Sequence, residues 1–250
     1  MKIKSFSLLF LLSCFSFTSC SSSKTSPYPV DTFTAKDGTK FTFTFFKHAS
    51  FAIETAGQYI YIDPVSKYAD YATLPKADLI LITHSHYDHL DSVAIQQLQK
   101  PTTKIFCDQI SAESFDACTL MTPGATVQPW PNLQIEAVPA YNFTEGHTQF
   151  HPRERGDCGY ILTLGKMRIY IAGDGENTEE MKALKDIDIA FLPVNQPYTM
   201  TVDQAIDAVK AMRPVIFYPY HYGEVDEKTD LNRLTDSLRD ITEIRIRPME

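Results

Sequence analysis

The sequence predicts an α/β (α+β) fold in which helices are layered on mixed β-sheet. Three observations lead to this fold class. Short strand-type runs in the first part of the folded region follow one another through tight connections, as in an antiparallel meander. A later apolar run is continuous rather than alternating, which indicates a strand buried on both faces. Strand runs and helices are interspersed without strict alternation, so a mixed sheet fits better than a doubly wound parallel sheet.

The first half of the folded region is predicted to be mostly strand. The meander comprises residues 41–46, 50–55 and 58–62, the last two joined at Ala56-Gly57. A buried strand at 79–82, a helix at 92–99 and a strand at 104–107 follow. Residues 111–131 carry mixed signals, and we leave them as short elements and loops.

The second half combines strands with two clear helices. Strands are predicted at 133–138 and 189–194, with a hairpin of 160–164 and 167–172 between them. A helix begins at Thr201, where Gln204 completes a capping-box pattern, and it ends before Pro214. A strand at 215–218, a helix marked by Leu231 to Ile241 and a strand at 243–247 complete the chain.

The N-terminus predicts export. Lys2 and Lys4 precede an apolar run at 6–17, which is typical of a signal peptide over residues 1–19. Cys20 resembles the lipidated cysteine of a bacterial lipoprotein, with an ordinary secretory signal as the alternative. Residues 20–30 are then a flexible tether, and 31–250 form one domain. We therefore expect an exported cell-envelope lipoprotein, periplasmic or on the cell surface, that touches the membrane only through Cys20.

Net charge and cysteine content limit which partners and which disulfide the sequence allows. A formal net charge of -8 argues against a nucleic-acid partner and leaves the oligomeric state open. An exported protein permits a disulfide, and Cys107 with Cys118 is the nearest pair. The sequence leaves this bridge undecided and slightly favours its absence. We expect Cys158 to be a buried packing residue rather than a thiol ligand.

The residues that could carry out chemistry are concentrated in one short segment of the sequence. Of the seven histidines, His84, His86 and His89 fall within six positions. Residues at i and i+2 of an extended segment point to the same side, so His84 and His86 can share one metal ion. Asp88 and His89 follow where the backbone must bend, and they can face a second ion.

Two further residues strengthen the prediction of a metal site. Asp174 and His221 each stand a few residues past an apolar strand, as His84 does. Three strand ends thus present imidazole or carboxylate groups, which suit zinc, manganese or iron. The prediction is a centre of two divalent metal ions, with zinc preferred.

Residues 83–90, Thr-His-Ser-His-Tyr-Asp-His-Leu, resemble the signature of the metallo-β-lactamase superfamily. Supporting segments occur in the same order at 47–51, 61–64, 141–142, 151–152, 171–174 and 219–223, so that the resemblance covers residues 41–248. Within the superfamily the chain is similar to the branch of the ascorbate-6-phosphate lactonases and the N-acyl-phosphatidylethanolamine phospholipases D. The resemblance implies a four-layer αββα sandwich with two metals at one edge of its sheets.

The resemblance also implies a ligand set. It places His84, His86 and His151 on one metal and Asp88, His89 and His221 on the other, with Asp174 bridging. His147 is the alternative to His151.

Two polar residues lie outside this ligand set. His48 is expected at the pocket mouth, where it is the second catalytic candidate beside Asp88. Asp63 is either a turn residue or a support for the metal-binding loop.

The activity implied is hydrolysis of a small molecule. A metal-bridging hydroxide, oriented by Asp88, would attack an ester, a lactone or a phosphodiester-type substrate. An iron-dependent oxidoreductase on the same fold and a non-catalytic zinc-binding lipoprotein are the alternatives. The sequence does not choose the substrate.

Overall fold

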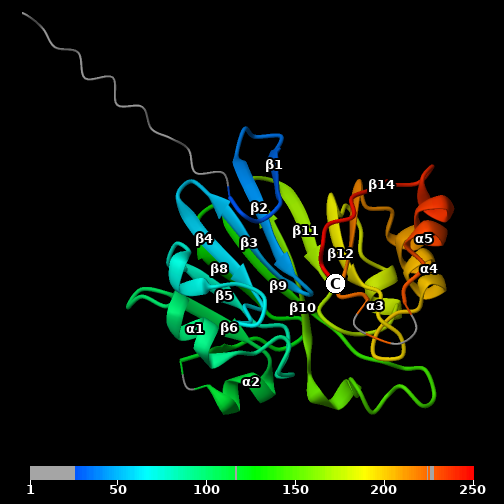
Figure 1. Cartoon of the computed structure of the whole chain (residues 1–250), viewed down its shortest axis with the longest axis horizontal. Helices are drawn as coiled ribbons and strands as arrows, with labels where there is room; N and C mark the ends of the chain where they lie inside the picture. The colour runs from blue at the N-terminus through cyan, green and yellow to red at the C-terminus, as the bar shows by residue number, and fades with distance from the viewer. Residues whose placement is uncertain (1–25, 116, 224, 226–227) are drawn as a thin grey trace, which may run out of the picture.

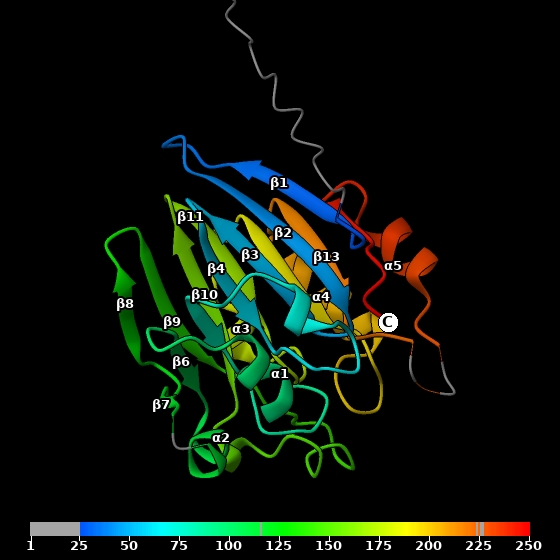
Figure 2. The same ribbon diagram turned by 60° about the vertical axis from the view of Figure 1, so that its left-hand side comes forward.

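The computed structural model describes residues 26–115, 117–223, 225 and 228–250, which form two seven-stranded sheets flanked by helices (Figure 1). The two sheets are stacked, as the rotated view in Figure 2 also shows. Helices cover the outer face of each sheet. The predicted α/β sandwich of four layers, helix, sheet, sheet and helix, is confirmed.

The first sheet has the strand order β1-β2-β3-β4-β5-β6-β7. Its strands are β1 (Val30–Thr34), β2 (Lys40–Lys47), β3 (Ser50–Thr55), β4 (Gln58–Ile62), β5 (Leu79–Leu81), β6 (Lys104–Cys107) and β7 (Thr119–Leu120). Strands β1 to β4 pair antiparallel, whereas β4 to β7 pair parallel. The sheet is therefore mixed, as predicted.

The second sheet repeats this plan in the order β14-β13-β12-β11-β10-β9-β8. Its strands are β8 (Thr126–Trp130), β9 (Leu133–Pro139), β10 (Cys158–Leu164), β11 (Met167–Ile171), β12 (Ile189–Pro193), β13 (Ile216–Tyr220) and β14 (Glu243–Ile244). Pairing is antiparallel from β8 to β11 and parallel from β11 to β14.

Three apolar layers hold the sandwich together. Between the sheets, aromatic rings dominate: Phe51 stacks on Phe191 with ring centroids 4.5 Å apart, and Phe191 stacks on Tyr218 at 4.8 Å. Helices α1 (Ser92–Leu98) and α2 (Gln109–Ser114) cover the first sheet. Helices α3 (Glu179–Lys182), α4 (Val202–Met212) and α5 (Leu231–Leu238) cover the second. Single 3₁₀ turns occur at Tyr71–Thr73 and Arg153–Arg155.

One edge of the sandwich receives the loops that follow β5, β11 and β13. The two sheets are joined there by hydrogen bonds: Cys158 N donates to Thr83 O at 3.0 Å, and His221 N donates to His48 O at 3.1 Å. Tyr160 adds a buried bond from its hydroxyl to Ile82 O at 2.8 Å. Loops from both sheets are thus fixed to one another at this edge.

The structure differs from the predicted elements in a few places. Strand β1 begins at Val30, the last residue assigned to the tether, and was not predicted because its side chains alternate between exposed and half-buried at a sheet edge. Within the undecided region 111–131 the structure forms β7, β8 and most of α2. The last strand, predicted to reach residue 247, ends at Ile244. The capping box of α4 is confirmed, with Thr201 and Gln204 bonding each other's backbone.

The cysteine prediction needs a correction. Cys107 and Cys118 form a disulfide, which the sequence slightly disfavoured. The reason is spatial: β6 ends at Cys107 and β7 begins at Thr119, so parallel pairing of these two strands brings the cysteines together. Cys158 is free and buried, and burial raises the pKa of its thiol to about 12.

The predicted signal peptide, Cys20 and residues 20–25 of the tether lie outside the described residues. Among the residues described, no helix is long and apolar enough to cross a membrane.

Candidate metal centre

A first group of potential ligands consists of His84, His86 and His151, whose candidate ligand atoms lie within 4.8 Å of one another. His84 and His86 stand in the loop after β5, and His84 Nε2 is 3.1 Å from His86 Nδ1. His151 comes from the loop between β9 and β10. Its Nδ1 faces Asp157 Oδ2 at 3.2 Å, which turns Nε2 toward the other two rings.

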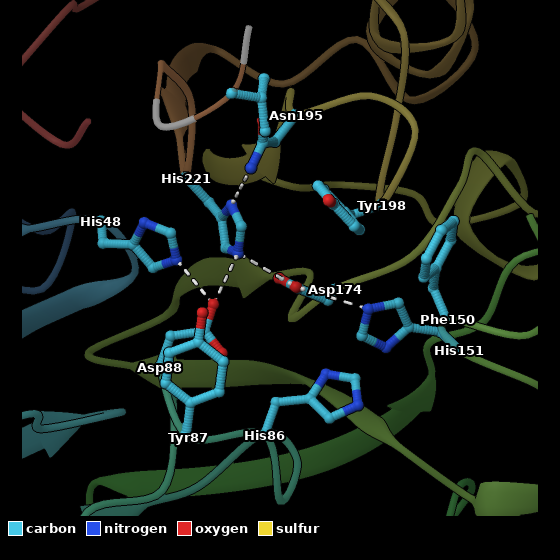
Figure 3. A pocket seen from close by; sticks show the side chains of 11 residues that line it. His48, His86, Tyr87, Asp88, Phe150, His151, Asp174, Asn195, Tyr198 and His221 are labelled. Atoms are coloured by element: carbon cyan, nitrogen blue, oxygen red, sulfur yellow. Dashed lines mark hydrogen bonds and ion pairs between the residues drawn. The ribbon is translucent and has the colours of Figure 1, made fainter.

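A second group consists of Asp88, His89, His221 and His48, again within 4.8 Å. His221 Nε2 is 3.8 Å from Asp88 Oδ2, and His48 Nε2 is 3.1 Å from the same oxygen (Figure 3). His221 follows β13 and His48 follows β2, so both sheets contribute to this group.

Asp174 lies between the two groups. Its Oδ2 is 3.1 Å from His221 Nε2 and 3.6 Å from His151 Nε2, contacts that Figure 3 marks. Its Oδ1 is 3.4 Å from His89 Nε2. Asp174 therefore stands where a residue shared by two metal ions would stand.

The backbone around Asp174 requires glycine. Gly173 has φ +66°, and a Cβ on it would lie 2.9 Å from Cys158 O. A Cβ on Gly175 would lie 2.7 Å from Tyr141 N. The Gly-Asp-Gly sequence after β11 thus turns the chain sharply and lets it pass close to the neighbouring loops.

Several atoms at this centre that could bind a metal are buried without a hydrogen-bond partner among the described residues. They are His89 Nε2, His221 Nε2 and Asp174 Oδ1. Buried polar atoms are rarely left unpaired, so these atoms need an additional partner. Imidazole nitrogens and carboxylate oxygens directed at a common point suit zinc, manganese or iron, and the residues present therefore fit two divalent ions.

The protonation of these groups agrees with metal binding. Burial lowers the pKa of His86 to about 4 and that of His84 well below its usual value, so both rings are neutral at pH 7. Burial alone would raise the pKa of Asp174, but the His221 and His89 imidazoles hold it well below its usual value. In His89 burial is opposed by Asp174 and Asp63, which raise its pKa well above the ordinary value. Without metal, the centre thus favours a positive charge at His89.

Asp63 supports the metal-binding loop rather than acting only as a turn residue. It is fully buried, and its carboxylate accepts hydrogen bonds from Thr83 N at 2.8 Å and Thr83 Oγ1 at 2.7 Å. The same carboxylate lies 2.8 Å from His89 Nδ1. This fixes the ring of His89 with Nε2 toward Asp174.

His48 is buried rather than placed at an open mouth, and it lines the pocket. Burial, with a smaller contribution from His221, lowers its pKa to about 4, so the ring is neutral. A neutral imidazole beside a carboxylate keeps its proton on the facing nitrogen, so His48 Nε2 donates to Asp88. Backbone φ is positive at His48, Asp63 and His221 (57°, 40° and 49°), a left-handed conformation that few non-glycine residues adopt and in which His and Asp are enriched.

The structure separates the two candidates for the third ligand of the first group. His151 is buried and faces Asp174, whereas the His147 side chain is 28% exposed and its Nδ1 lies 3.3 Å from Glu176 Oε1. His151 therefore belongs to the cluster, and His147 does not.

Sequence reasoning missed two residues that orient the ligands and one that holds the neighbouring loop. Asn195 Nδ2 lies 3.2 Å from His221 Nδ1, and Asp157 holds His151. Glu176 is fully buried and accepts hydrogen bonds from Phe143 N and Thr144 N, both at 2.8 Å. The available signals were positional: Asn195 follows a buried strand, Glu176 is two residues past Asp174, and Asp157 precedes β10.

A pocket of about 350 Å³ opens over the cluster. Its lining comprises His48, His86, Tyr87, Asp88, Phe150, His151, Asp174, Asn195, Tyr198, His221 and Val225. Tyr198 belongs to the loop between β12 and α4. Both groups of candidate ligands can therefore be reached by a small molecule.

The fold and this cluster define a class of protein: an αββα sandwich with a histidine and aspartate centre at the edge between its sheets. The β-lactamase superfamily domain matches residues 42–221. A UPF0173 metal-dependent hydrolase of Thermoplasma volcanium is 33% identical over 190 residues, covering 72% of this chain and 82% of the relative. The chain belongs to the metallo-β-lactamase fold family, as its resemblance indicated, and UPF0173 proteins are its homologues.

Two solved structures are similar over most of the chain. A candidate metal-dependent hydrolase from Parabacteroides distasonis shares 49% identity with a TM-score of 0.85, covering 89% of this chain and all of that one. A metallo hydrolase from the archaeon Ignicoccus hospitalis shares 25% identity with a TM-score of 0.69, covering 83% of this chain and 95% of that one.

Proposed function

We propose that this protein is a binuclear metal-dependent hydrolase acting on a small molecule. The observation that carries the proposal is the convergence of two ligand groups on Asp174 beneath one open pocket. A structural zinc site is normally closed and four-coordinate, whereas this cluster offers seven candidate ligands and room for a substrate. Relatives described as metal-dependent hydrolases support the same reading.

His84, His86 and His151 would hold one ion and Asp88, His89 and His221 the other, with Asp174 shared between them. When bound, such a pair of ions activates water near neutral pH and polarises the bond to be cleaved. We take zinc as the resident metal because five imidazoles and two carboxylates suit it, although they also suit manganese and iron.

The chain's own side chains would handle the proton. Burial opposes ionisation of Asp88, but the hydrogen bond from His48 together with the nearby His89 and His221 imidazoles outweighs it and keeps the pKa of Asp88 below its usual value. Asp88 is thus ionised and turned into the pocket, where it can accept a proton from the attacking water. His48 would position the Asp88 carboxylate through its hydrogen bond.

Export belongs to the proposal as well. The Cys107–Cys118 disulfide supports an oxidising compartment, which agrees with the predicted signal peptide and lipidated Cys20. A Cys20→Ser variant should move from the membrane fraction to the soluble exported fraction. Retention of this variant in membranes would contradict anchoring through Cys20.

The function is tested by two ligand variants and one matched control. His86→Ala and Asp174→Ala should each lower the bound metal, measured by plasma mass spectrometry, and abolish hydrolysis. The circular dichroism spectrum should be retained. His147→Ala removes a histidine of the same loop that contacts Glu176 instead of the cluster, and it should keep its metal.

Unchanged metal content in both ligand variants would refute the assignment. Oxygen consumption by an iron-loaded protein, with no hydrolysis of ester, lactone or phosphodiester panels, would favour the oxidoreductase alternative. A fully loaded protein with neither activity would favour a binding role.

A further inference from the structure

We propose that the substrate is an uncharged carboxylic ester or lactone whose flat apolar part packs against Phe150 and Tyr198. This inference rests on the proposed hydrolase function and narrows its substrate class. In the reaction, water adds to the carbonyl carbon and the bond from that carbon to the alkoxy oxygen breaks. The products are a carboxylic acid and an alcohol, which takes one proton from the water.

Phe150 and Tyr198 form an aromatic wall beside the cluster of candidate metal ligands. The rings of Phe150 and Tyr198 meet edge to face, with centroids 4.8 Å apart and planes at 69° (Figure 3). Tyr198 remains 40% exposed although it lines the pocket, so a large part of its surface is free to contact a ligand. Flat apolar groups pack well on such surfaces, because ring edges and faces attract one another.

Backbone hydrogen bonds hold this wall in place. Tyr198 N donates to Asn195 O at 3.0 Å, and Tyr198 O accepts from Asn142 Nδ2 at 2.7 Å. Phe150 N donates to His147 O at 3.1 Å, and the next residue is the candidate ligand His151. The wall is therefore fixed relative to the reacting centre and can orient a substrate without rearranging.

The pocket offers nothing to a negatively charged substituent away from the bond that is cleaved. No lysine or arginine lines it among the residues that the structure describes. The two arginines that follow His151 are committed elsewhere. Arg153 binds Glu180 at 2.7 Å, and Arg155 binds Asp157 at 3.1 Å and Ser85 Oγ at 3.0 Å. Asn195 Nδ2 faces His221 Nδ1 at 3.2 Å, and the remaining amide oxygen is an acceptor that cannot bind an anion.

A remote carboxylate or phosphate would therefore lose its hydration without gaining a counter-charge, which is unfavourable. Enzymes that act on phosphoryl groups commonly add arginine or lysine to their metal ions on the phosphoryl oxygens, and among the described residues this lining has neither. Two acidic side chains, Asp88 and Asp174, face the pocket instead. A cavity of about 350 Å³ lies at the small end of ligand pockets, suited to one ring with a short acyl chain.

The test compares phenyl acetate with 4-carboxyphenyl acetate, which differ by one remote carboxylate. Each kcat/KM is divided by the rate of hydroxide-catalysed hydrolysis to remove the difference in leaving group. The neutral ester should be preferred at least about tenfold, since a stranded charge is worth more than one decade. Bis(4-nitrophenyl) phosphate, an anionic phosphodiester, is the third substrate and should be the poorest.

Two variants test the wall itself. Phe150→Ala and Tyr198→Ala should raise KM for phenyl acetate about three- to tenfold, the range of one aromatic contact, and change KM for methyl acetate little. Phe143→Ala is the matched control, because Phe143 is 52% exposed in the same loop and does not line the pocket. Metal content is measured in all three variants and should equal that of the parent.

Equal turnover of the two aryl acetates, or faster turnover of the phosphodiester, would overturn this inference while leaving a metal-dependent hydrolase in place. An equal rise in KM for aryl and methyl acetate in the wall variants would also overturn it. Failure of the fully loaded protein to hydrolyse any of these substrates would instead refute the proposed function, and the substrate class with it.

Discussion

Replacing Asp63 by asparagine should weaken metal binding although Asp63 is not itself a candidate ligand. The carboxylate is fully buried and lies 2.7–2.8 Å from three donors, Thr83 N, Thr83 Oγ1 and His89 Nδ1. Asparagine keeps the size of the side chain but replaces one oxygen with an NH₂ group. Whichever way the amide is turned, that NH₂ group meets an N–H of Thr83 or of His89.

The expected magnitude follows from these contacts. Loss of a partner that orients a ligand histidine lowers metal affinity about 10- to 100-fold, which is about 1.4–2.8 kcal/mol of binding free energy. One buried donor without an acceptor lowers the free energy of unfolding by about 1–3 kcal/mol in the metal-free protein. Asp63→Asn should therefore reduce both quantities.

Metal affinity is measured by competition with a chromophoric chelator, and stability by urea unfolding of the metal-free protein. Asp78→Asn is the matched control. Asp78 also accepts a backbone bond, from Tyr59 N at 2.9 Å, but it precedes β5 instead of following it. The control should lose some stability and keep its metal affinity. Parental metal affinity in Asp63→Asn, or an equal loss in the control, would refute the positioning role.

Three further predictions concern the stability of the fold. Gly173→Ala should lower the free energy of unfolding by at least about 1–2 kcal/mol. The reason is that alanine is strained at φ +66° and that its Cβ would meet Cys158 O. Thermal unfolding and the metal content of the variant check this. Burial alone would raise the pKa of Asp31, but hydrogen bonds from Arg247 and Tyr218 outweigh it and lower that pKa. The stabilisation is present above the unfolded pKa of about 3.9 and is lost as pH falls through the folded value. Asp31→Asn should thus cost about 1–3 kcal/mol at pH 7, with a difference from the parent that shrinks in urea titrations as pH falls through the folded pKa of Asp31; a difference that does not change with pH would contradict it. Cys107→Ser should lower the unfolding free energy by about 3 kcal/mol, since the bridge closes a short loop, and thiol titration of the unfolded parent should find only Cys158 among the described cysteines.

The sequence predicted those parts of the fold whose hydrophobic pattern is local. The meander, the buried β5 and the capped α4 each follow from spacing within one segment. Strand β1 could not be found in this way, because it is held at a sheet edge by pairing with β2 and by the contacts of Asp31 with Arg247, 216 positions later. The disulfide was missed for the same reason: only the pairing of β6 with β7 shows that its cysteines meet.

The residues of the candidate site were likewise predictable only where the sequence signal is local. The spacing of His84 and His86 is a local signal, and Asp174 and His221 could be found because each follows a strand. The residues that orient these ligands carry no such pattern. Asp157 and Asn195 are ordinary polar residues in the sequence, and only the closure of the sandwich brings them to His151 and His221.

The loop of residues 143–150 is fastened at both ends. Glu176 holds the amides of Phe143 and Thr144 at its start, and Asn142 N donates to His151 O at 2.8 Å where it closes. Insertions or substitutions between these two anchors can therefore reshape the pocket wall without displacing His151. Within such a framework, recognition of new substrates can evolve separately from the chemistry, and an engineer could vary Phe150, the residue of this loop that lines the pocket, while the metal centre stays intact.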